Sequence, residues 1–246
     1  MVPETDVERG LPAQGKSGFD AILFDLDGVL VDSLGAIEKS MRWWAMERGL
    51  DPEEVLARSH GRRDEDLIRE CAPCLSVETE IKLIEDFDVQ EAKSVRPLPG
   101  ARRVLRSLEA GSWAVITSGS RRVAAARMAG SGLPEPSRLV TAESVRRGKP
   151  FPDGYLLAAD RLGAVPERCL VVEDAPAGLA AARAAGMPCL GVGAALAGPL
   201  PGLVGRVRDL EEVRVVTGPT GLRVLTGRSR THAGTGPRER RPGPRP

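Results

Sequence analysis

The feature that most constrains the fold of this chain is an apolar segment, residues 19–30, which contains two carboxylates followed by a glycine. In a strand, alternate side chains share a face, so Asp25 and Asp27 would lie side by side where a hydrophobic strand ends. Two like charges resist burial unless a cation lies between them or one of them is protonated. Magnesium prefers carboxylate and carbonyl oxygens, so the pair indicates a magnesium site. The alternative is an ordinary strand end with solvated aspartates, for which Gly28 is a suitable turn residue.

Apolar strands and helical stretches alternate along most of the chain, which is the pattern of a parallel sheet covered by helices. The sequence therefore predicts an α/β fold with a Rossmann-like, three-layer core. The candidate strands are residues 21–25, 113–117, 139–141, 169–173 and 188–192.

Capping residues mark the ends of the helices that connect these strands. We expect Gly111 to end a helix over residues 101–110, Ser120 to cap one over 121–129, and Asp153 to cap one that Gly163 ends.

A helical segment, residues 33–96, interrupts this alternation after the first strand. Ile37, Met41 and Trp44 fall on one helical face, and residues 78–87 are also helical in type. An insertion at this place lies over the carboxyl ends of the strands, where open parallel sheets bind their ligands. We expect it to act as a cap that excludes water and selects the substrate.

The predicted domain organisation follows from these patterns. Two segments, 19–32 and 97–216, form the α/β core, and residues 33–96 form the cap. Within the core, residues 204–216 are expected to add a last strand and helix. The polar N-terminus, 1–18, is expected to be flexible, and the Arg-, Pro- and Gly-rich tail, 226–246, to be disordered.

Composition narrows the class of protein. A chain of 246 residues with 41% hydrophobic content can bury a sizeable core. A net charge of +1 and only 3% aromatic residues argue against nucleic acid as a partner of the folded core. No apolar run is long enough to span a membrane, so we expect a cytoplasmic protein, as a monomer or small homo-oligomer. The four cysteines do not form a disulfide framework, and Cys71 with Cys74 makes only half of a zinc site.

A second apolar strand also ends in two acids, Glu173 and Asp174, followed by small residues that open a helix. Such acids could merely complement the helix dipole. Because Asp25 and Asp27 end another strand, a cation shared by both strand ends is the simpler explanation. Asp174 is then the expected direct ligand, and Glu173 either binds the metal or orients its ligands.

Two further segments fit phosphate chemistry at the same edge. A strand runs into Thr117, Ser118 and Gly119, which offer hydroxyls and free amide hydrogens for phosphate oxygens. Lys149 precedes a proline, which favours an extended conformation just ahead of a helix. A lysine held there can neutralise the carboxylates and a bound phosphoryl group. An ordinary turn and a surface lysine are the alternatives.

In their order and spacing, these motifs resemble those of the haloacid dehalogenase-like hydrolases, specifically the phosphatases with a helical cap after the first strand. The resemblance covers residues 19–193. The matching positions are Asp25-Leu26-Asp27-Gly28 for the first motif, Thr117 for the second, Lys149 for the third and Glu173-Asp174 for the fourth.

The resemblance implies a role for each residue. Asp25 attacks phosphorus and forms an aspartyl phosphate. Magnesium is held by Asp25, the main-chain carbonyl of Asp27 and Asp174. Asp27 protonates the leaving alkoxide and then removes a proton from the hydrolytic water. Thr117 and Lys149 hold the phosphoryl oxygens in the transition state.

The implied activity is magnesium-dependent hydrolysis of a small phosphate ester, either a sugar phosphate or a polyol phosphate such as glycerol 3-phosphate. Asp27 favours phosphoryl transfer over dehalogenation, because a halide leaves without a proton and a dehalogenase would not need a general acid at this position. Three alternatives stay open: a sugar phosphomutase of the beta-phosphoglucomutase type, a phosphoglycolate phosphatase, and a non-catalytic sugar-phosphate-binding regulator. In the cap, Arg62 or Arg63 is expected to meet a substrate hydroxyl or phosphate, unless both are simply solvated.

Overall fold

A six-stranded parallel sheet forms the centre of the protein in the computed structural model, which describes residues 9–12, 18–196 and 198–227. The strand order is β6-β5-β2-β7-β8-β9, and each pair of neighbours is parallel. The strands are β2 (Ala21–Asp25), β5 (Trp113–Ile116), β6 (Leu139–Val140), β7 (Cys169–Glu173), β8 (Cys189–Val192) and β9 (Leu203–Val207). The five predicted strands are confirmed to within a residue or two, and β9 is the expected last strand.

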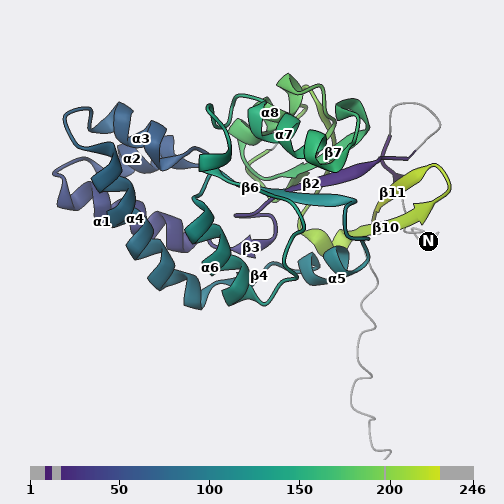
Figure 1. Ribbon diagram of the computed structural model, residues 1–246, viewed down its shortest axis with the longest axis horizontal. Coiled ribbons are helices and arrows are strands. Elements are labelled where there is room, and N and C mark those ends of the chain that lie inside the picture. Colours follow the sequence, from purple (N-terminus) through teal and green to yellow (C-terminus); the bar gives the residue numbers. More distant parts are fainter. Residues whose placement is uncertain (1–8, 13–17, 197, 228–246) are drawn as a thin grey trace, which may run out of the picture.

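Helices cover both faces of this sheet, so the core has the predicted three layers (Figure 1). Successive residues of a strand point to opposite faces. Phe24 of β2 packs in one apolar cluster with the helices α5 and α6, whereas its neighbour Leu23 packs in a second cluster with α7 and α8. The helices are α5 (Ala101–Arg106), α6 (Arg121–Ser131), α7 (Asp153–Leu162) and α8 (Pro176–Ala184), and the short 3₁₀ turns are η2 (Ala142–Ser144) and η3 (Pro166–Arg168).

Two of the predicted helix ends are wrong in detail. Helix α5 ends at Arg106 rather than before Gly111. Asp153 is the first residue of α7 and Pro152 stands at the cap position; the Asp153 carboxylate pairs with Arg147, at 2.9 Å. The other capping predictions are confirmed: the Ser120 hydroxyl accepts the amide of Val123 at 3.3 Å, and a left-handed Gly163 ends α7.

The predicted helical insertion is confirmed as a bundle of four helices at one end of the molecule (Figure 1). Met41, Trp44 and Ile84 are at the centre of its own apolar cluster, separate from the two clusters of the core. The strands β3 and β4 pair where the chain enters and leaves the cap. The elements are α1 (Leu34–Glu47), α2 (Pro52–Ser59), α3 (Asp64–Cys71), α4 (Val77–Glu91), η1 (Ala92–Ser94), β3 (Val31–Asp32) and β4 (Arg96–Pro97).

A three-stranded antiparallel sheet lies at the opposite end from the cap (Figure 1). After β9 the chain forms a 3₁₀ turn and a hairpin, instead of the expected helix. The expected flexible N-terminus differs in part, because Arg9–Gly10 forms β1 and pairs with β11. Residues 1–8, 13–17 and the tail from 228 onward lie outside the described residues. The elements are β1 (Arg9–Gly10), η4 (Leu210–Glu212), β10 (Val213–Gly218) and β11 (Gly221–Thr226).

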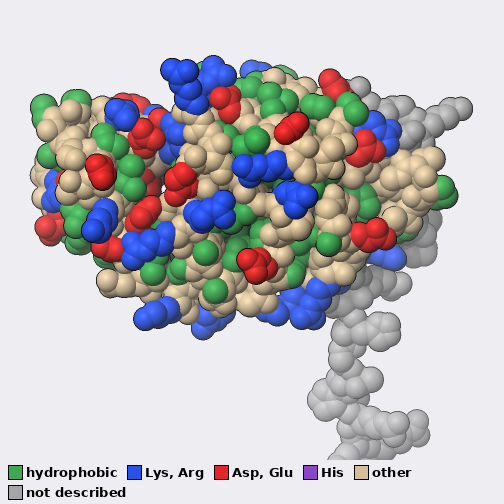
Figure 2. Space-filling model, in the orientation of Figure 1, with side chains coloured by type: hydrophobic (Ala, Val, Ile, Leu, Met, Phe, Trp, Pro, Cys, Tyr) green, Lys and Arg blue, Asp and Glu red, His purple; other side chains and the backbone are tan. Residues whose placement is uncertain are grey.

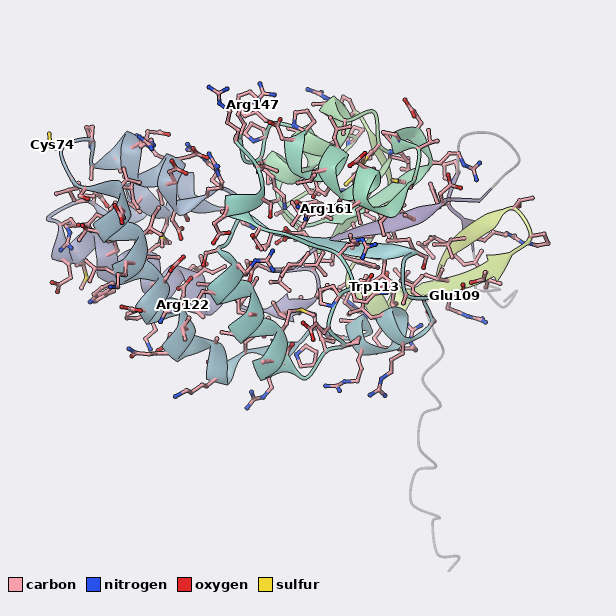
Figure 3. The ribbon with its side chains drawn as sticks, viewed as in Figure 1. Cys74, Glu109, Trp113, Arg122, Arg147 and Arg161 are labelled. Carbon is pink, nitrogen blue, oxygen red and sulfur yellow. The ribbon has the colours of Figure 1, made fainter. Side chains whose placement is uncertain are left out.

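Two sequence observations concern the surface. Figure 2 shows basic and acidic side chains interspersed over the face in view, in keeping with the small net charge. Figure 3 shows Cys74 at the outer end of the cap, where it is exposed. Among the described residues, no helix is long and apolar enough to cross a membrane.

Candidate active site

The carboxyl ends of two neighbouring strands bring three acids together. Asp25 ends β2, Glu173 ends the adjacent β7, and Asp174 follows it. One ligand atom from each of the three lies within 4.8 Å of the others, and all three residues are buried. Burial raises the pKa of Asp25 well above its ordinary value. Such a cluster of oxygen donors fits a hard divalent cation such as magnesium.

Lys149 compensates much of this negative charge. Its ammonium group donates to Asp25 and, at 2.5 Å, to Glu173, and it lies 5.5 Å from the centre of the Tyr155 ring. Burial alone would lower the pKa of Lys149, but the carboxylates of Asp25 and Glu173 outweigh burial and raise it. The lysine therefore stays charged beside Asp25.

Glu173 is already saturated by donors from the protein. One oxygen accepts from Lys149 and from the Tyr155 hydroxyl, at 2.8 Å, and the other accepts the amides of Asp174 and Ala175, both at 2.9 Å. A carboxylate with four donors has little capacity left for a metal ion. Of the three acids, Asp25 and Asp174 therefore have more capacity left for a cation than Glu173 has.

Gly28 gives Asp174 the room that it needs. Its φ is +80°, and a Cβ added there would lie 2.0 Å from the Asp174 Oδ2 atom. A residue with a side chain at this position would push the carboxylate out of the cluster. The glycine after the paired aspartates is therefore required by the acid of another strand, in addition to its turn.

Asp27 lies apart from the three acids and faces three donors. Its carboxylate accepts from the Ser33 hydroxyl at 2.5 Å, from Arg127 at 2.9 Å and from the Thr117 hydroxyl at 3.3 Å. The Asp27 carboxylate is therefore held by other partners than Asp25, in a different environment.

The turn after β5 lies beside Asp27. The Thr117 hydroxyl accepts the amide of Gly119 at 3.0 Å, which holds the turn closed. The Ser118 hydroxyl donates to the carbonyl of Gly61, in the cap, at 2.9 Å. This turn therefore also connects the core to the cap.

A cavity of about 250 Å³ lies between the core and the cap, and Asp25, Asp27, Thr117 and Asp174 line it. Helices α1, α2, α3, α4 and α6, the loop between α2 and α3, and the turn after β5 contribute its other residues. The site is thus a partly enclosed chamber over the strand ends, of a size suited to a small molecule.

The two cap arginines differ in position. Arg62 lines the cavity but pairs with Glu70 at 2.8 Å. Arg63 does not line this cavity; it is buried, pairs with Asp66 at 2.8 Å and donates to the carbonyl of Val145 in the core, at 3.4 Å. Arg63 therefore connects the cap to the core.

Four residues of the site were not given a role from the sequence. His60 lies 3.2 Å from Asp174, Arg127 bridges Asp27 to Asp88 of the cap, and Asp64 lines the cavity beside them. One signal was available, because Arg127 is a charged residue on the apolar face of α6, next to Met128. Asp64 and Asp88 carry no such signal, since acids are common on helices.

Comparisons with known proteins identify the family. A model described as haloacid dehalogenase-like hydrolase matches residues 19–186. Hexitol phosphatase A of Escherichia coli (strain K12) is 44% identical over 205 residues, which cover 81% of this chain and 95% of that relative. Glycerol-1-phosphate phosphohydrolase 2 of Saccharomyces cerevisiae (strain ATCC 204508 / S288c) is 34% identical over 70% of this chain and 74% of the relative. The crystal structure of a hydrolase from Pseudomonas syringae has the same fold, with a TM-score of 0.69 at 22% identity over 78% of this chain and 94% of its own.

The chain therefore belongs to the haloacid dehalogenase-like hydrolases. Within that family it is a phosphatase, a hydrolase of phosphoric monoesters.

Proposed function

We propose that this protein is a magnesium-dependent phosphatase that hydrolyses a small polyol or sugar phosphate through an aspartyl phosphate on Asp25. The observation that carries the proposal is the position of Asp25, between buried Lys149 and Asp174 on the floor of a chamber that the cap closes. The similarity to Hexitol phosphatase A and to Glycerol-1-phosphate phosphohydrolase 2 supports the same substrate class.

The residues present fit magnesium. Asp25 and Asp174 offer carboxylate oxygens close together, and Gly28 leaves space for the second of them. When bound, the metal ion supplies positive charge that offsets the repulsion between a carboxylate nucleophile and a phosphate ester.

The side chains of the protein divide the remaining work. Asp25 attacks phosphorus in line, so that the O–P bond to the alcohol breaks as the new one forms. Asp27 gives its proton to the departing alkoxide, then takes one from the water that hydrolyses the aspartyl phosphate, so the proton balance closes. Lys149 and Thr117 stabilise the charge on the phosphoryl oxygens. The phosphate leaves as inorganic phosphate, and Asp25 is regenerated.

Hydrolysis is favoured over mutase chemistry by the relatives, because the two that are reported above are phosphatases by name. A mutase would return the phosphoryl group to a second sugar hydroxyl instead of to water. Product analysis separates the two, since a mutase gives an isomeric sugar phosphate and little free phosphate.

The test is phosphate release from a hexitol 6-phosphate, glycerol 3-phosphate, phosphoglycolate and beta-glucose 1-phosphate, with magnesium and with a chelator. We expect magnesium-dependent release from the wild-type protein and none from Asp25→Asn. Asp20→Asn is the matched control, because Asp20 precedes the same strand at its other end and pairs with Arg168. Full activity in Asp25→Asn would contradict the proposed mechanism, and no release from any ester would contradict the proposed function.

A further inference from the structure

The wall of the cavity that faces the strand ends is acidic. Asp64 begins α3, Asp88 comes from the last turn of α4, and both line the cavity. Glu38 of α1 adds a third carboxylate at the exposed rim. We call Asp64, Asp88 and Glu38 the cap wall. This wall and the acids at the strand ends line the same cavity, and Arg127 bridges Asp88 of the wall to Asp27.

Asp64 stands out within the cap wall. Its side chain is half-buried, yet it makes no hydrogen bond or ion pair with any residue in the part of the chain that the structure describes. Burial raises its pKa to about 7, and Asp88 adds to the rise, while Arg127 opposes it. A partly desolvated carboxyl without a partner is costly to keep. Its hydrogen-bonding capacity is available to a molecule in the cavity.

Asp88 and Arg127 also keep unused capacity. They form an ion pair at 2.7 Å, and both are more than nine-tenths buried. Nevertheless the Arg127 Nε atom and the Asp88 Oδ1 atom are buried without a hydrogen bond of good geometry among the described residues, and the Ser40 hydroxyl lies near enough to Asp88 to act to lower its pKa. Buried polar atoms in native proteins are nearly always paired, so such a concentration beside one cavity points to ligand recognition.

The cationic side chains that line the cavity are already paired with acids. Arg127 serves Asp27 and Asp88, Arg62 serves Glu70, and His60 lies against Asp174. A substrate with a second anionic group would thus find a carboxylate wall and no uncommitted cation in the described lining.

The remaining lining of the cap is apolar. Leu34, Ile37, Met41 and Leu56 form this part, next to the cap wall. A polyol has C–H groups that suit such side chains and hydroxyl groups that suit carboxylates.

We propose that Asp64 and Asp88 of the cap wall bind the hydroxyl groups of an uncharged polyol chain, and that Asp64 is a specificity residue that rejects phosphate esters with a carboxylate at the far end. Hydroxyls donate to the Asp64 and Asp88 oxygens, while the ester phosphate lies over Asp25. The inference rests on the proposed phosphatase function and adds the chemistry of the rest of the substrate.

The experiment compares kcat/KM for a hexitol 6-phosphate with that for phosphoglycolate, which carries a carboxylate, at pH 8, where Asp64 with its pKa of about 7 is charged. The wild-type protein is expected to prefer the hexitol ester by about a hundredfold, because one substrate gains hydrogen bonds to charged groups and the other meets like charge. In Asp64→Asn the preference is expected to fall at least about tenfold. Glu78→Gln is the matched control, since Glu78 is an exposed acid of the cap that does not line the cavity.

A wild-type preference for phosphoglycolate, or an unchanged preference in Asp64→Asn, would overturn the inference. Asp64→Ser removes the same charge with a smaller side chain and serves if the asparagine variant does not fold. Calorimetric binding of both esters to the same proteins needs no turnover, so it tests selection separately from chemistry. Binding that discriminates without any phosphate release would count against the proposed function alone, while release without discrimination would count against this inference alone.

Discussion

Two groups of acids at one cavity differ in how their charge is compensated. At the strand ends, Lys149 lies between Asp25 and Glu173, and backbone amides satisfy the rest of Glu173. In the cap wall, Asp88 shares its cation, Arg127 of α6, with Asp27 of the core. Asp64 has no hydrogen-bond or ion-pair partner among the described residues. The comparison shows that the first cluster is built to stay assembled without substrate, whereas the second keeps bonding capacity for a ligand.

Removing Lys149, which compensates the charge of Asp25 and Glu173, should have the largest effect on stability. In Lys149→Ala, Asp25 and Glu173 are left buried without their cation, and we expect a loss of about 3 kcal/mol in the free energy of unfolding. Urea unfolding in the presence of a chelator measures this. Lys39→Ala is the control, because Lys39 forms an exposed pair with Glu91 and should change stability by less than about 1 kcal/mol. Equal losses in the two variants would mean that the strand-end cluster does not depend on its lysine.

Removing Arg127, which pairs with both Asp27 and Asp88, should have the second largest effect on stability. Arg127→Met leaves Asp27 and Asp88 unpaired, and we expect about 2 kcal/mol less stability together with weaker attachment of the cap. Hydrogen exchange in α4 reports the attachment. Arg122→Met is the matched control on the same helix: Arg122 pairs with Asp86 of α4 at 2.5 Å but is half-exposed (Figure 3). Equal increases in the hydrogen exchange of α4 in both variants would mean that the burial of the Arg127 ion pairs does not matter for the attachment of the cap.

A smaller effect should follow from filling the space beside Asp174. Gly28→Ala introduces a side chain at φ +80°, which costs about 1 kcal/mol, and places a Cβ 2.0 Å from the carboxylate. We expect the magnesium concentration for half-maximal activity to rise about tenfold. Gly163→Ala has a similar φ, +65°, with nothing within 4 Å of its Cβ, so it carries the backbone cost alone. A similar rise in the control would assign the effect to backbone strain.

The smallest effect concerns the unpaired acid of the cap wall. The pKa of Asp64 is raised to about 7 in the folded protein, from about 4 when unfolded. A raised pKa means that the folded state holds the proton more tightly, so this stabilisation is complete below pH 4 and is lost as the pH rises to 7. Asp64→Asn should therefore match the wild type at pH 4 or below and exceed its stability at pH 8, by about 1 kcal/mol, because water in the cavity reduces the effect. Urea unfolding at the two pH values checks this, and a difference that does not vary with pH would contradict it.

The same contrast explains how much could be predicted from the sequence. Asp25 and Glu173 end apolar strands, and the geometry of a parallel sheet brings such ends to one edge. The strands, the three layers and the acidic strand ends could therefore be predicted from local patterns. Lys149 was predictable because its neighbours restrict its backbone.

The cap wall could not be predicted in this way. Asp64 and Asp88 lie on different helices, and only the packing of the cap against α6 places them beside Arg127. The C-terminal hairpin was missed for a similar reason, since β1 and β11 pair across nearly the whole chain. Arg63 shows the reverse error. Its place in a loop of the cap suggested contact with the substrate, but its side chain connects the cap to the core.

The contact between Gly61 and Ala175 limits how caps can be exchanged during evolution. Gly61 lies in the loop between α2 and α3 with a φ of +75°, and a Cβ there would lie 2.8 Å from the Ala175 side chain in the core. The four cap helices can diverge, because they have an apolar cluster of their own. A new cap grafted onto this core would still need a glycine at position 61, since that loop touches the segment that also carries Asp174. The cap can therefore be replaced as a unit only if the contact between position 61 and Ala175 is kept.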